Sequence, residues 1–198
     1  MKLEQTFTGL ELEAGVDEAG RGCLAGPVVA AAVILPLDYT LSGLDDSKKL
    51  TEKKRYELRK EILAHAEYWC VGMSSAQRID QVNILNATYD AMHEALAGLG
   101  AKPNHVLIDG NRFRPWEDVP YDCMIKGDGR FLNIAAASIL AKTYRDEIME
   151  MLDQEFPQYG WKGNKGYPTK AHKEAIRDHG PSPYHRMSFN WQIPPTLF

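Results

Sequence analysis

The sequence predicts an α/β fold in which a mixed β-sheet carries helices on its faces. Two strand-like segments come first in the chain, and helix-like and strand-like segments then alternate. This order is typical of a mixed sheet flanked by helices. A chain of 198 residues also buries roughly 70% of its unfolded surface, so it needs neither a disulfide nor a structural metal to fold.

The expected strands are short and rich in apolar residues. The segment 11–17 alternates polar and apolar residues, which is the period of a strand with one buried face. The run PVVAAAVIL within 27–35 contains the β-branched residues that favour a strand. Further strands are expected near 67–75, in NHVLIDG up to Asp109, and in YDCMIKG.

Capping residues and helix breakers set the limits of the expected helices. Thr51 and Thr169 are suitable N-caps, and Pro157 stops a long helix that begins at Gly129 or Arg130. The stretch QYGWKGNKGYPTK between the last two helices is expected to be a glycine-rich loop. The helices are expected over residues 51–66, 83–99, 129–155 and 169–180.

Composition and charge describe an ordinary globular protein with two basic segments. The net charge is −4, yet seven Lys or Arg residues lie within 48–60 and six within 160–186. Such segments can bind phosphates locally, although 48–60 is explained equally well as a solvated helix face. No apolar run approaches about 20 residues, and the start lacks a signal-peptide core, so we expect a cytoplasmic protein without a membrane span. The three cysteines are expected to be reduced.

The stretch GVDEAGRGCLAGPVV allows two interpretations of its glycines. Gly20, Gly22 and Gly26 nearly match the dinucleotide-binding fingerprint, which would indicate a nicotinamide-binding oxidoreductase. That fingerprint requires a helix after the glycines, whereas a strand-like run follows Gly26. Asp17 and Glu18 would also repel a pyrophosphate. We therefore favour the second interpretation, in which these acids belong to a metal site.

Four acidic residues are the candidate metal ligands. Asp17 and Glu18 end the first expected strand, Asp109 ends a later one, and Asp128 precedes the long helix. Each has a simpler explanation as a turn residue or, for Asp128, as a helix N-cap. Together they predict an oxygen-rich site for hard divalent cations. Because consecutive strand residues face opposite ways, Asp17 and Glu18 can share this site only if the strand ends between them or if Glu18 contributes its backbone oxygen.

Six ordered segments resemble the bacterial ribonuclease HII family. They are GVDEAGRGCLAGPVVAAAVIL, DSKKLTEKKR, LIDGN, KGDGRFLNIAAASILAKTYRDE, KGYPTKAH and HGPSPYHRMSF, which span residues 15–189. The resemblance implies a ribonuclease H-like mixed five-stranded sheet flanked by helices, with a small helical C-terminal extension. We accordingly expect a catalytic domain over 1–155 and an extension over 156–198 that contributes to substrate binding.

The resemblance also implies an activity and its catalytic residues. Members of this family cleave the RNA strand of RNA–DNA hybrids and single ribonucleotides embedded in duplex DNA. The implied cofactors are two divalent cations, Mn²⁺ or Mg²⁺, and hydrolysis with two such ions leaves 5′-phosphate and 3′-hydroxyl ends. By position, the four catalytic and metal-binding carboxylates match Asp17, Glu18, Asp109 and Asp128.

Further residues are candidates for substrate binding. The family's Gly-Arg-Gly motif matches Gly20, Arg21 and Gly22, and its junction-sensing tyrosine matches Tyr167. The glycines leave backbone N–H groups accessible, and Arg21 offers a permanent charge. The remaining candidates for phosphate contacts are Lys48 and two residues four apart on the long helix, Ser138 and Lys142.

The remaining expectations concern structure and partners. His172 and His185 lack metal-ligand spacing and are expected to make structural hydrogen bonds. The expected partners of a monomeric enzyme are RNA–DNA hybrid and ribonucleotide-containing duplex DNA. The tail WQIPPTLF matches sliding-clamp-binding peptides poorly, which makes a clamp contact the weakest of these predictions. The alternative function is an inactive nucleic-acid-binding module of the same fold, which the presence of all four carboxylates disfavours.

Overall fold

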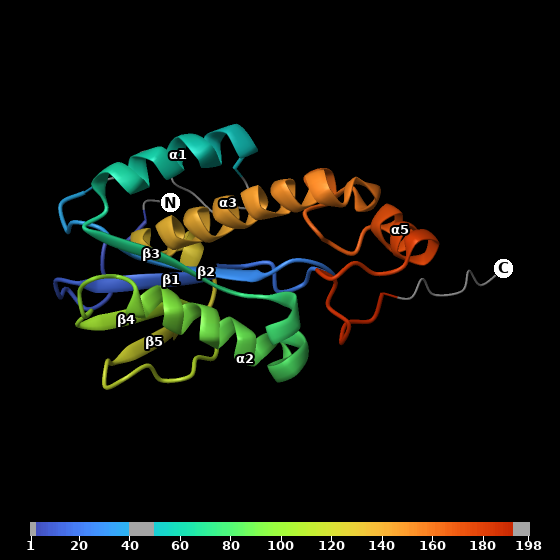
Figure 1. The fold of residues 1–198 in the computed structure, drawn as a ribbon. Coiled ribbons are helices and arrows are strands. Elements are labelled where there is room, and N and C mark those ends of the chain that lie inside the picture. The colour runs from blue at the N-terminus through green and yellow to red at the C-terminus, as the bar shows by residue number, and fades with distance from the viewer. Residues whose placement is uncertain (1–2, 40–49, 192–198) are drawn as a thin grey trace.

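The computed structural model describes residues 3–39 and 50–191, which form one five-stranded sheet with flanking helices (Figure 1). β1 pairs antiparallel with β2 and parallel with β4, which confirms the predicted mixed sheet. The strand order is β3-β2-β1-β4-β5. The strands are β1 (Glu13–Ala19), β2 (Val28–Ile34), β3 (Tyr68–Ser74), β4 (His105–Asp109) and β5 (Tyr121–Met124).

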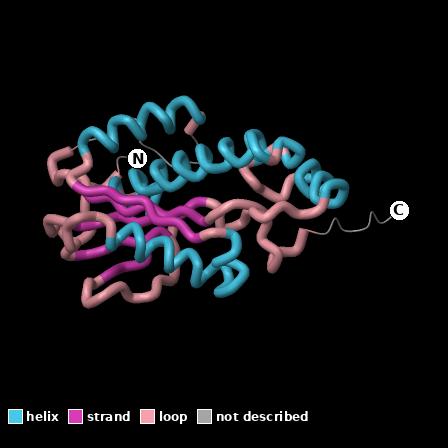
Figure 2. Tube along the Cα trace, in the orientation of Figure 1, coloured by secondary structure: helices cyan, strands magenta, loops and turns pink. Residues whose placement is uncertain are grey.

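The helices cover both faces of the sheet, as Figure 1 and Figure 2 show. α3 (Leu132–Glu155) packs on β1 and β2, and α1 (Glu52–His65) packs on α3. α2 (Ala76–Ala97) covers the opposite face of the sheet. In the part of the chain that the structure describes, no helix is both long and apolar enough to cross a membrane. Because α3 and α2 cover opposite faces of the sheet, the central strand β1 lies between two helical layers.

β1 is packed closely on both of its faces. Ala14 and Val16 enter the apolar core beneath α2, whereas Gly15 faces α3. A β-carbon at Gly15 would lie 2.2 Å from the backbone carbon of Asn133, so only glycine allows the strand and the helix to approach so closely. The Asn133 amide donates to the carbonyl oxygen of Glu13 at 2.7 Å. These contacts fix the start of α3 across β1.

The first strand differs from its predicted limits at both ends. Leu12 has a left-handed backbone conformation (φ 55°), so β1 begins at Glu13 rather than at residue 11. The strand continues to Ala19 and stops at Gly20, whose φ is +93°. Asp17 and Glu18 therefore lie inside the strand, and the prediction that they end it is wrong.

The second helix starts earlier than predicted. α2 begins at Ala76, where the Ser75 side chain accepts a hydrogen bond as N-cap, rather than at Asn83. Asn83 (φ 68°, ψ 165°) interrupts the helix. Its side-chain oxygen accepts from the backbone N–H groups of Leu85 and Asn86, which is how an N-cap acts. The predicted start is thus the beginning of the second section of α2.

The long helix starts later than predicted. α3 begins at Leu132, not at residue 129 or 130, and its N-cap is Phe131, which makes no side-chain cap. The preceding Gly127–Gly129 segment forms a 3₁₀ turn, η2. The interpretation of Asp128 as the helix N-cap is therefore wrong.

The C-terminal segment forms an aromatic cluster against the turn that joins β1 and β2. The predicted glycine-rich loop contains two short helices, η3 (Pro157–Tyr159) and α4 (Trp161–Asn164), and α5 (Lys170–His179) follows with Thr169 as N-cap, as predicted. The Tyr159 and Trp161 rings stack with their centroids 5.0 Å apart, and Leu24 joins the same apolar cluster. The domain boundary after residue 155 remains a prediction, and this cluster crosses it.

Two buried histidines lie within this cluster, and their hydrogen bonds fix both as neutral. The Trp161 indole N–H donates to His172 Nε2 at 2.9 Å, and the Ser182 backbone N–H donates to His185 Nδ1 at 2.9 Å. Each ring therefore carries its proton on the other nitrogen. His172 Nδ1 donates to the carbonyl oxygen of Tyr167 at 2.9 Å, and His185 Nε2 donates to His172 Nε2 at 3.1 Å. The structure thus agrees with the predicted structural role.

The neutral histidine pair should make the fold sensitive to mild acid. Burial, and then the neighbouring His172, lowers the pKa of His185 from its ordinary 6.5 to about 4. Between these two pKa values the unfolded chain binds more protons than the folded protein, so the free energy of unfolding falls as the pH falls. We expect the urea midpoint of the wild type to drop between about pH 6.5 and about pH 5, and His185→Gln to weaken that dependence. Equal pH dependence in both proteins would contradict the neutral assignment.

Candidate active site

Asp17 and Glu18 are neighbours on β1 whose side chains leave opposite faces of the sheet. Asp17 faces α3 and is 5% exposed, and it accepts a hydrogen bond from the Ser138 hydroxyl of that helix. Glu18 lies on the α2 side, as the alternation of strand residues requires. The strand does not end between them, so one of the two predicted conditions for a shared site is not met.

Asp109 lies level with Asp17 on the adjacent strand. β1 and β4 run parallel, with Val16 opposite Ile108, and one further residue along this register brings Asp109 beside Asp17. Asp109 Oδ1 accepts from the backbone N–H of Gly127 at 2.7 Å. This bond ties the η2 turn, and with it the buried Asp128, to the end of β4.

The Asp17 carboxyl is affected both by burial and by the charges of neighbouring carboxylates. Burial raises the pKa of the Asp17 carboxyl well above its usual value, and the charges of Glu18 and Asp109 raise it further. Hydrogen bonds from Ser138 and from the Glu18 backbone N–H, the latter at 2.6 Å, act in the opposite direction. Folding therefore brings negative charge together without enough positive charge to balance it.

The donor chemistry of this site fits hard divalent cations. Carboxylate oxygens are the ligands that such ions prefer, and a cation would relieve the repulsion that raises the Asp17 pKa. Within residues 3–39 and 50–191, no three or more His, Cys, Asp or Glu side chains form a ready-made metal-binding group. The four predicted ligands, Asp17, Glu18, Asp109 and Asp128, would have to bring their carboxylates closer together to hold a metal ion.

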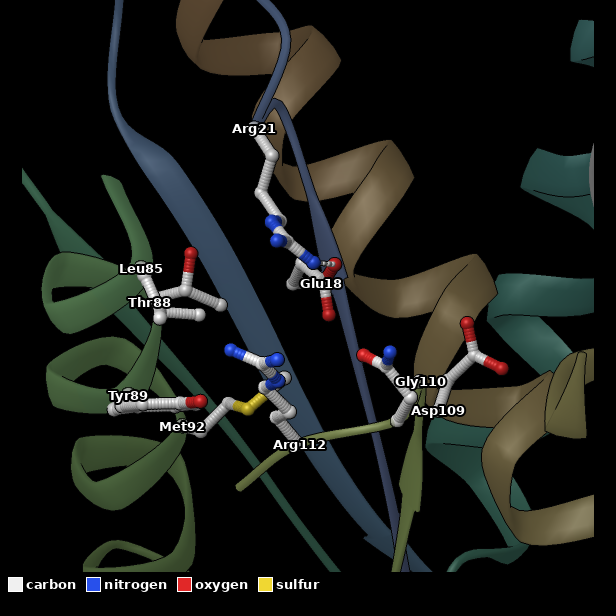
Figure 3. A pocket seen from close by; sticks show the side chains of 10 residues that line it. Glu18, Arg21, Leu85, Thr88, Tyr89, Met92, Asp109, Gly110 and Arg112 are labelled. Atoms are coloured by element: carbon white, nitrogen blue, oxygen red, sulfur yellow. Dashed lines mark hydrogen bonds and ion pairs between the residues drawn. The ribbon is translucent and has the colours of Figure 1, made fainter. Parts of the chain in front are cut away.

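The glycine turn, which consists of Gly20, Arg21 and Gly22, is held from behind by the buried side chain of Arg186. The Arg186 guanidinium donates to the carbonyl oxygens of Gly20 at 2.7 Å and Arg21 at 2.9 Å. It also donates to the carbonyl oxygen of Gly26 at 3.0 and 3.1 Å. On the outer side, Arg21 Nη1 lies 3.0 Å from Glu18 Oε1, an ion pair drawn in Figure 3.

A second buried arginine connects this turn to the loop that carries Tyr167. Arg145 donates to the carbonyl oxygens of Ala25 at 3.1 Å, Pro27 at 3.0 Å and Lys165 at 2.8 Å. A β-carbon at Gly20 would lie 1.9 Å from Arg145 Nε, which explains the glycine there. At Gly22, by contrast, a β-carbon would meet nothing within 4 Å, so the protein itself does not require this glycine.

The structure brings most of the predicted site residues into one cavity, the α3-side cavity, of about 430 Å³. Lys142 pairs with Asp146 at 2.7 Å, and its ammonium lies 5.7 Å from the centre of the half-exposed Tyr167 ring. Asp128 is not among the lining residues, and Lys48 falls outside the described residues. The predicted residues that line the cavity are Asp17, Glu18, Asp109, the glycine turn, Ser138, Lys142 and Tyr167.

Sequence reasoning missed three arginines near this site. Arg55 of α1 lines the α3-side cavity, and only its place in the basic segment 48–60 pointed to it. Arg145 and Arg186 are 1% and 0% exposed, yet nothing in the sequence distinguishes a buried arginine from a solvated one. All three come from segments that carry the family resemblance.

Removing the Asp17 charge should stabilise the metal-free fold. The asparagine in Asp17→Asn keeps the shape of the side chain but removes a carboxylate whose pKa burial and its neighbours hold high. Near neutral pH, in chelator, we expect the melting temperature to rise by about 2–4 °C for each kcal/mol of repulsion removed. Asp118→Asn is the control, because that exposed carboxylate pairs with Lys102. A lower melting temperature for Asp17→Asn would show that the carboxylate stabilises the fold.

The family model and two similar curated proteins that match this chain all carry the same family name. The family model for Ribonuclease HII matches residues 14–192. The Ribonuclease HII of Bacteroides fragilis is 60% identical over 179 residues, 90% of this chain and 89% of that protein. The Ribonuclease HII of Parabacteroides distasonis is 60% identical over 189 residues, 96% of this chain and 94% of that protein.

Solved structures show the same fold. Ribonuclease HII from Archaeoglobus fulgidus, solved in complex with PCNA, superposes with a TM-score of 0.75 at 26% identity, covering 92% of this chain and 96% of that one. Bst-RNase HIII, solved in complex with Mn²⁺, superposes with a TM-score of 0.67 at 20% identity, covering 87% of this chain and 64% of that one. The strand order and helical layers described above are therefore those of a known fold.

Proposed function

The chain belongs to the ribonuclease HII family and is a metal-dependent hydrolase of the ribonuclease H type; from this premise we propose that it cuts the RNA strand of RNA–DNA hybrids and single ribonucleotides embedded in duplex DNA. The observation that carries the proposal is the convergence of Asp17 and Asp109 on the α3 side of the sheet, beside the glycine turn. A phosphodiester lying on that turn would pass over both carboxylates.

Two divalent cations, Mn²⁺ or Mg²⁺, are the proposed cofactors. When bound, they supply Lewis acids that neutralise the phosphate and lower the pKa of the attacking water. Asp17, Glu18, Asp109 and Asp128 are the proposed ligands, with Glu18 contributing through its backbone oxygen or after a movement of its side chain. The raised pKa of Asp17 supports this assignment, because burial and two neighbouring carboxylates leave a charge that a cation would balance.

The glycine turn and Tyr167 are the proposed means of recognising the ribonucleotide. The space around Gly22 supports a close approach of the substrate backbone, since no atom of the protein would meet a side chain there. Tyr167 is 43% exposed and lines the α3-side cavity together with Asp17, Glu18 and Asp109. Its ring can pack on a sugar, and its hydroxyl can form a hydrogen bond with a 2′-hydroxyl, the group that distinguishes RNA from DNA. Ser138, Lys142 and the undescribed Lys48 are proposed to contact phosphates.

The proposed enzyme is a cytoplasmic monomer, and its tail can contact a sliding clamp. The complex of the archaeal ribonuclease HII with PCNA supports a clamp contact as the weaker part of this proposal. Residues 192–198 of the tail lie outside the described residues.

The experiment that tests the function uses a duplex with one embedded ribonucleotide, incubated with Mg²⁺, with Mn²⁺ or with chelator. Hydrolysis by water leaves a 5′-phosphate and a 3′-hydroxyl, and cutting should stop in chelator. A 2′,3′-cyclic phosphate would instead show attack by the neighbouring 2′-hydroxyl and contradict the mechanism. Binding without cleavage under all conditions would favour an inactive nucleic-acid-binding module.

Asp109→Asn should nearly abolish cleavage while substrate binding survives. The asparagine can still accept from the Gly127 N–H, which keeps the η2 turn in place, but it lacks the charge that holds a cation. We expect loss of kcat at saturating Mg²⁺ and an unchanged Kd for the duplex measured in chelator. A variant that kept the wild-type rate would remove Asp109 from the proposed ligand set.

Tyr167→Ala should reduce discrimination more than it reduces chemistry. A stacked aromatic ring contributes about 1–3 kcal/mol to binding of a nucleic-acid strand. A single embedded ribonucleotide offers one correctly placed junction, whereas a long hybrid offers many 2′-hydroxyls, so the loss of kcat/KM should be larger on the former. The measured quantity is the ratio of kcat/KM on the two substrates at one fixed salt concentration. Equal losses on both would mean that Tyr167 only supports the fold.

A further inference from the structure

A second cavity lies on the α2 side of Glu18. It has a volume of about 290 Å³ and shares Glu18, Arg21 and Asp109 with the α3-side cavity. Figure 3 shows α2 forming one wall and the segment after β4 another, with the Asp109 carboxylate directed away. We call it the α2-side cavity. The two cavities therefore meet at the proposed catalytic acids.

The walls of the α2-side cavity combine an apolar floor with an exposed cation. Leu85, Thr88 and Met92 of α2 line one side. Arg112 projects from the segment after β4 into the space between α2 and β1, as Figure 3 shows. An apolar floor suits the face of a sugar ring, and a guanidinium suits a phosphate.

Arg112 differs from the other arginines around it. Arg21 is paired with Glu18, and Arg114 is paired with Asp90 at 2.6 Å. For Arg112, no ion pair or hydrogen bond is found among residues 3–39 and 50–191. Its charge is therefore available to an anion from outside the protein.

The position of the α2-side cavity indicates which anion Arg112 would bind. A strand that rests on the glycine turn with a phosphate at the acids must continue past them, and the α2-side cavity is the hollow adjoining the acids on the side away from Tyr167. We propose that this cavity is a substrate subsite in which Arg112 binds a backbone phosphate on the side of the cleaved bond away from Tyr167. This proposal rests on the proposed function.

A phosphate contact at Arg112 would set the register of the substrate strand relative to the metal site. Phosphate contacts set the register of a protein on a nucleic-acid strand, whereas recognition of the 2′-hydroxyl needs that register to be correct. With Tyr167 on one side of the acids and Arg112 on the other, the strand is held at two points, and the phosphate between them is presented to the metal site.

The test compares Arg112→Gln with Arg114→Gln, its matched control in the same segment. The substrates are a long duplex with one embedded ribonucleotide and two shortened duplexes, each ending just beyond the cleavable phosphate on one side or the other. On the long duplex, Arg112→Gln should lower kcat/KM about tenfold and reduce the salt dependence by about one counterion. Arg114→Gln should match the wild type, and Arg112→Lys should recover part of the loss.

The shortened duplexes locate the contact. On the duplex that is shortened on the Arg112 side of the cleavable phosphate, Arg112→Gln should match the wild type, whereas Tyr167→Ala should still lower kcat/KM. On the duplex that is shortened on the Tyr167 side, Tyr167→Ala should match the wild type and Arg112→Gln should lower kcat/KM. An unchanged kcat/KM for Arg112→Gln on the long duplex would overturn the subsite, as would loss of both effects on the same shortened duplex.

Binding in chelator separates this proposal from the proposed function. A wild type that cuts none of these duplexes would contradict the function. The same duplexes still report on the subsite through their Kd values, which should follow the pattern given for kcat/KM. Equal Kd values for wild type and Arg112→Gln would overturn it.

Discussion

The bonds from two buried guanidinium groups to backbone carbonyl oxygens hold together the parts of the proposed site. Arg186 bonds the carbonyl oxygens of Gly20, Arg21 and Gly26, and Arg145 bonds those of Ala25, Pro27 and Lys165. Buried carbonyl oxygens without donors are costly, so these arginines replace water for a turn that cannot form a strand ladder. Burial lowers the pKa of Arg186 only to about 10, so the side chain stays charged at neutral pH. The glycine turn, the residues just before β2 and the Tyr167 loop thus share one rigid support.

The strand pattern and the helix caps made much of this fold predictable. Thr51 and Thr169 cap the helices that were expected after them, and the β-branched run at 27–35 is a strand. Two single backbone conformations account for part of the difference between the expected and observed elements. Leu12 and Asn83 adopt positive φ values that are uncommon for residues with side chains; the first sets where β1 begins, and the second divides α2 into two sections. Local propensity does not predict such conformations, because tertiary contacts decide them.

The site was predictable only to the level of residue types. The family resemblance placed Asp17, Asp109 and the glycine turn, and the parallel pairing of β1 with β4 then brought the acids level. The sequence left open whether the strand ends between Asp17 and Glu18, and the continuation of β1 to Ala19 decides that Glu18 faces α2. Arg112 carried no signal at all, because a charged residue after a strand usually lies in solvent. Its significance appears only when the folded chain places it beside a cavity.

The continuation of β1 through Asp17 and Glu18 explains why the acids divide the surface into two cavities. Had the strand ended between them, both side chains could have turned toward α3 and left the α2 side without a carboxylate. Instead, strand alternation sends one carboxylate to each face, and the next pair along β1 and β4 sets Asp109 with Asp17. The charges of Glu18 and Asp109 nevertheless both act on the buried Asp17 carboxyl and raise its pKa, in addition to the effect of burial. A cation bound among these carboxylates would relieve that repulsion, so the proposed metal site depends on the strand geometry that brings them together.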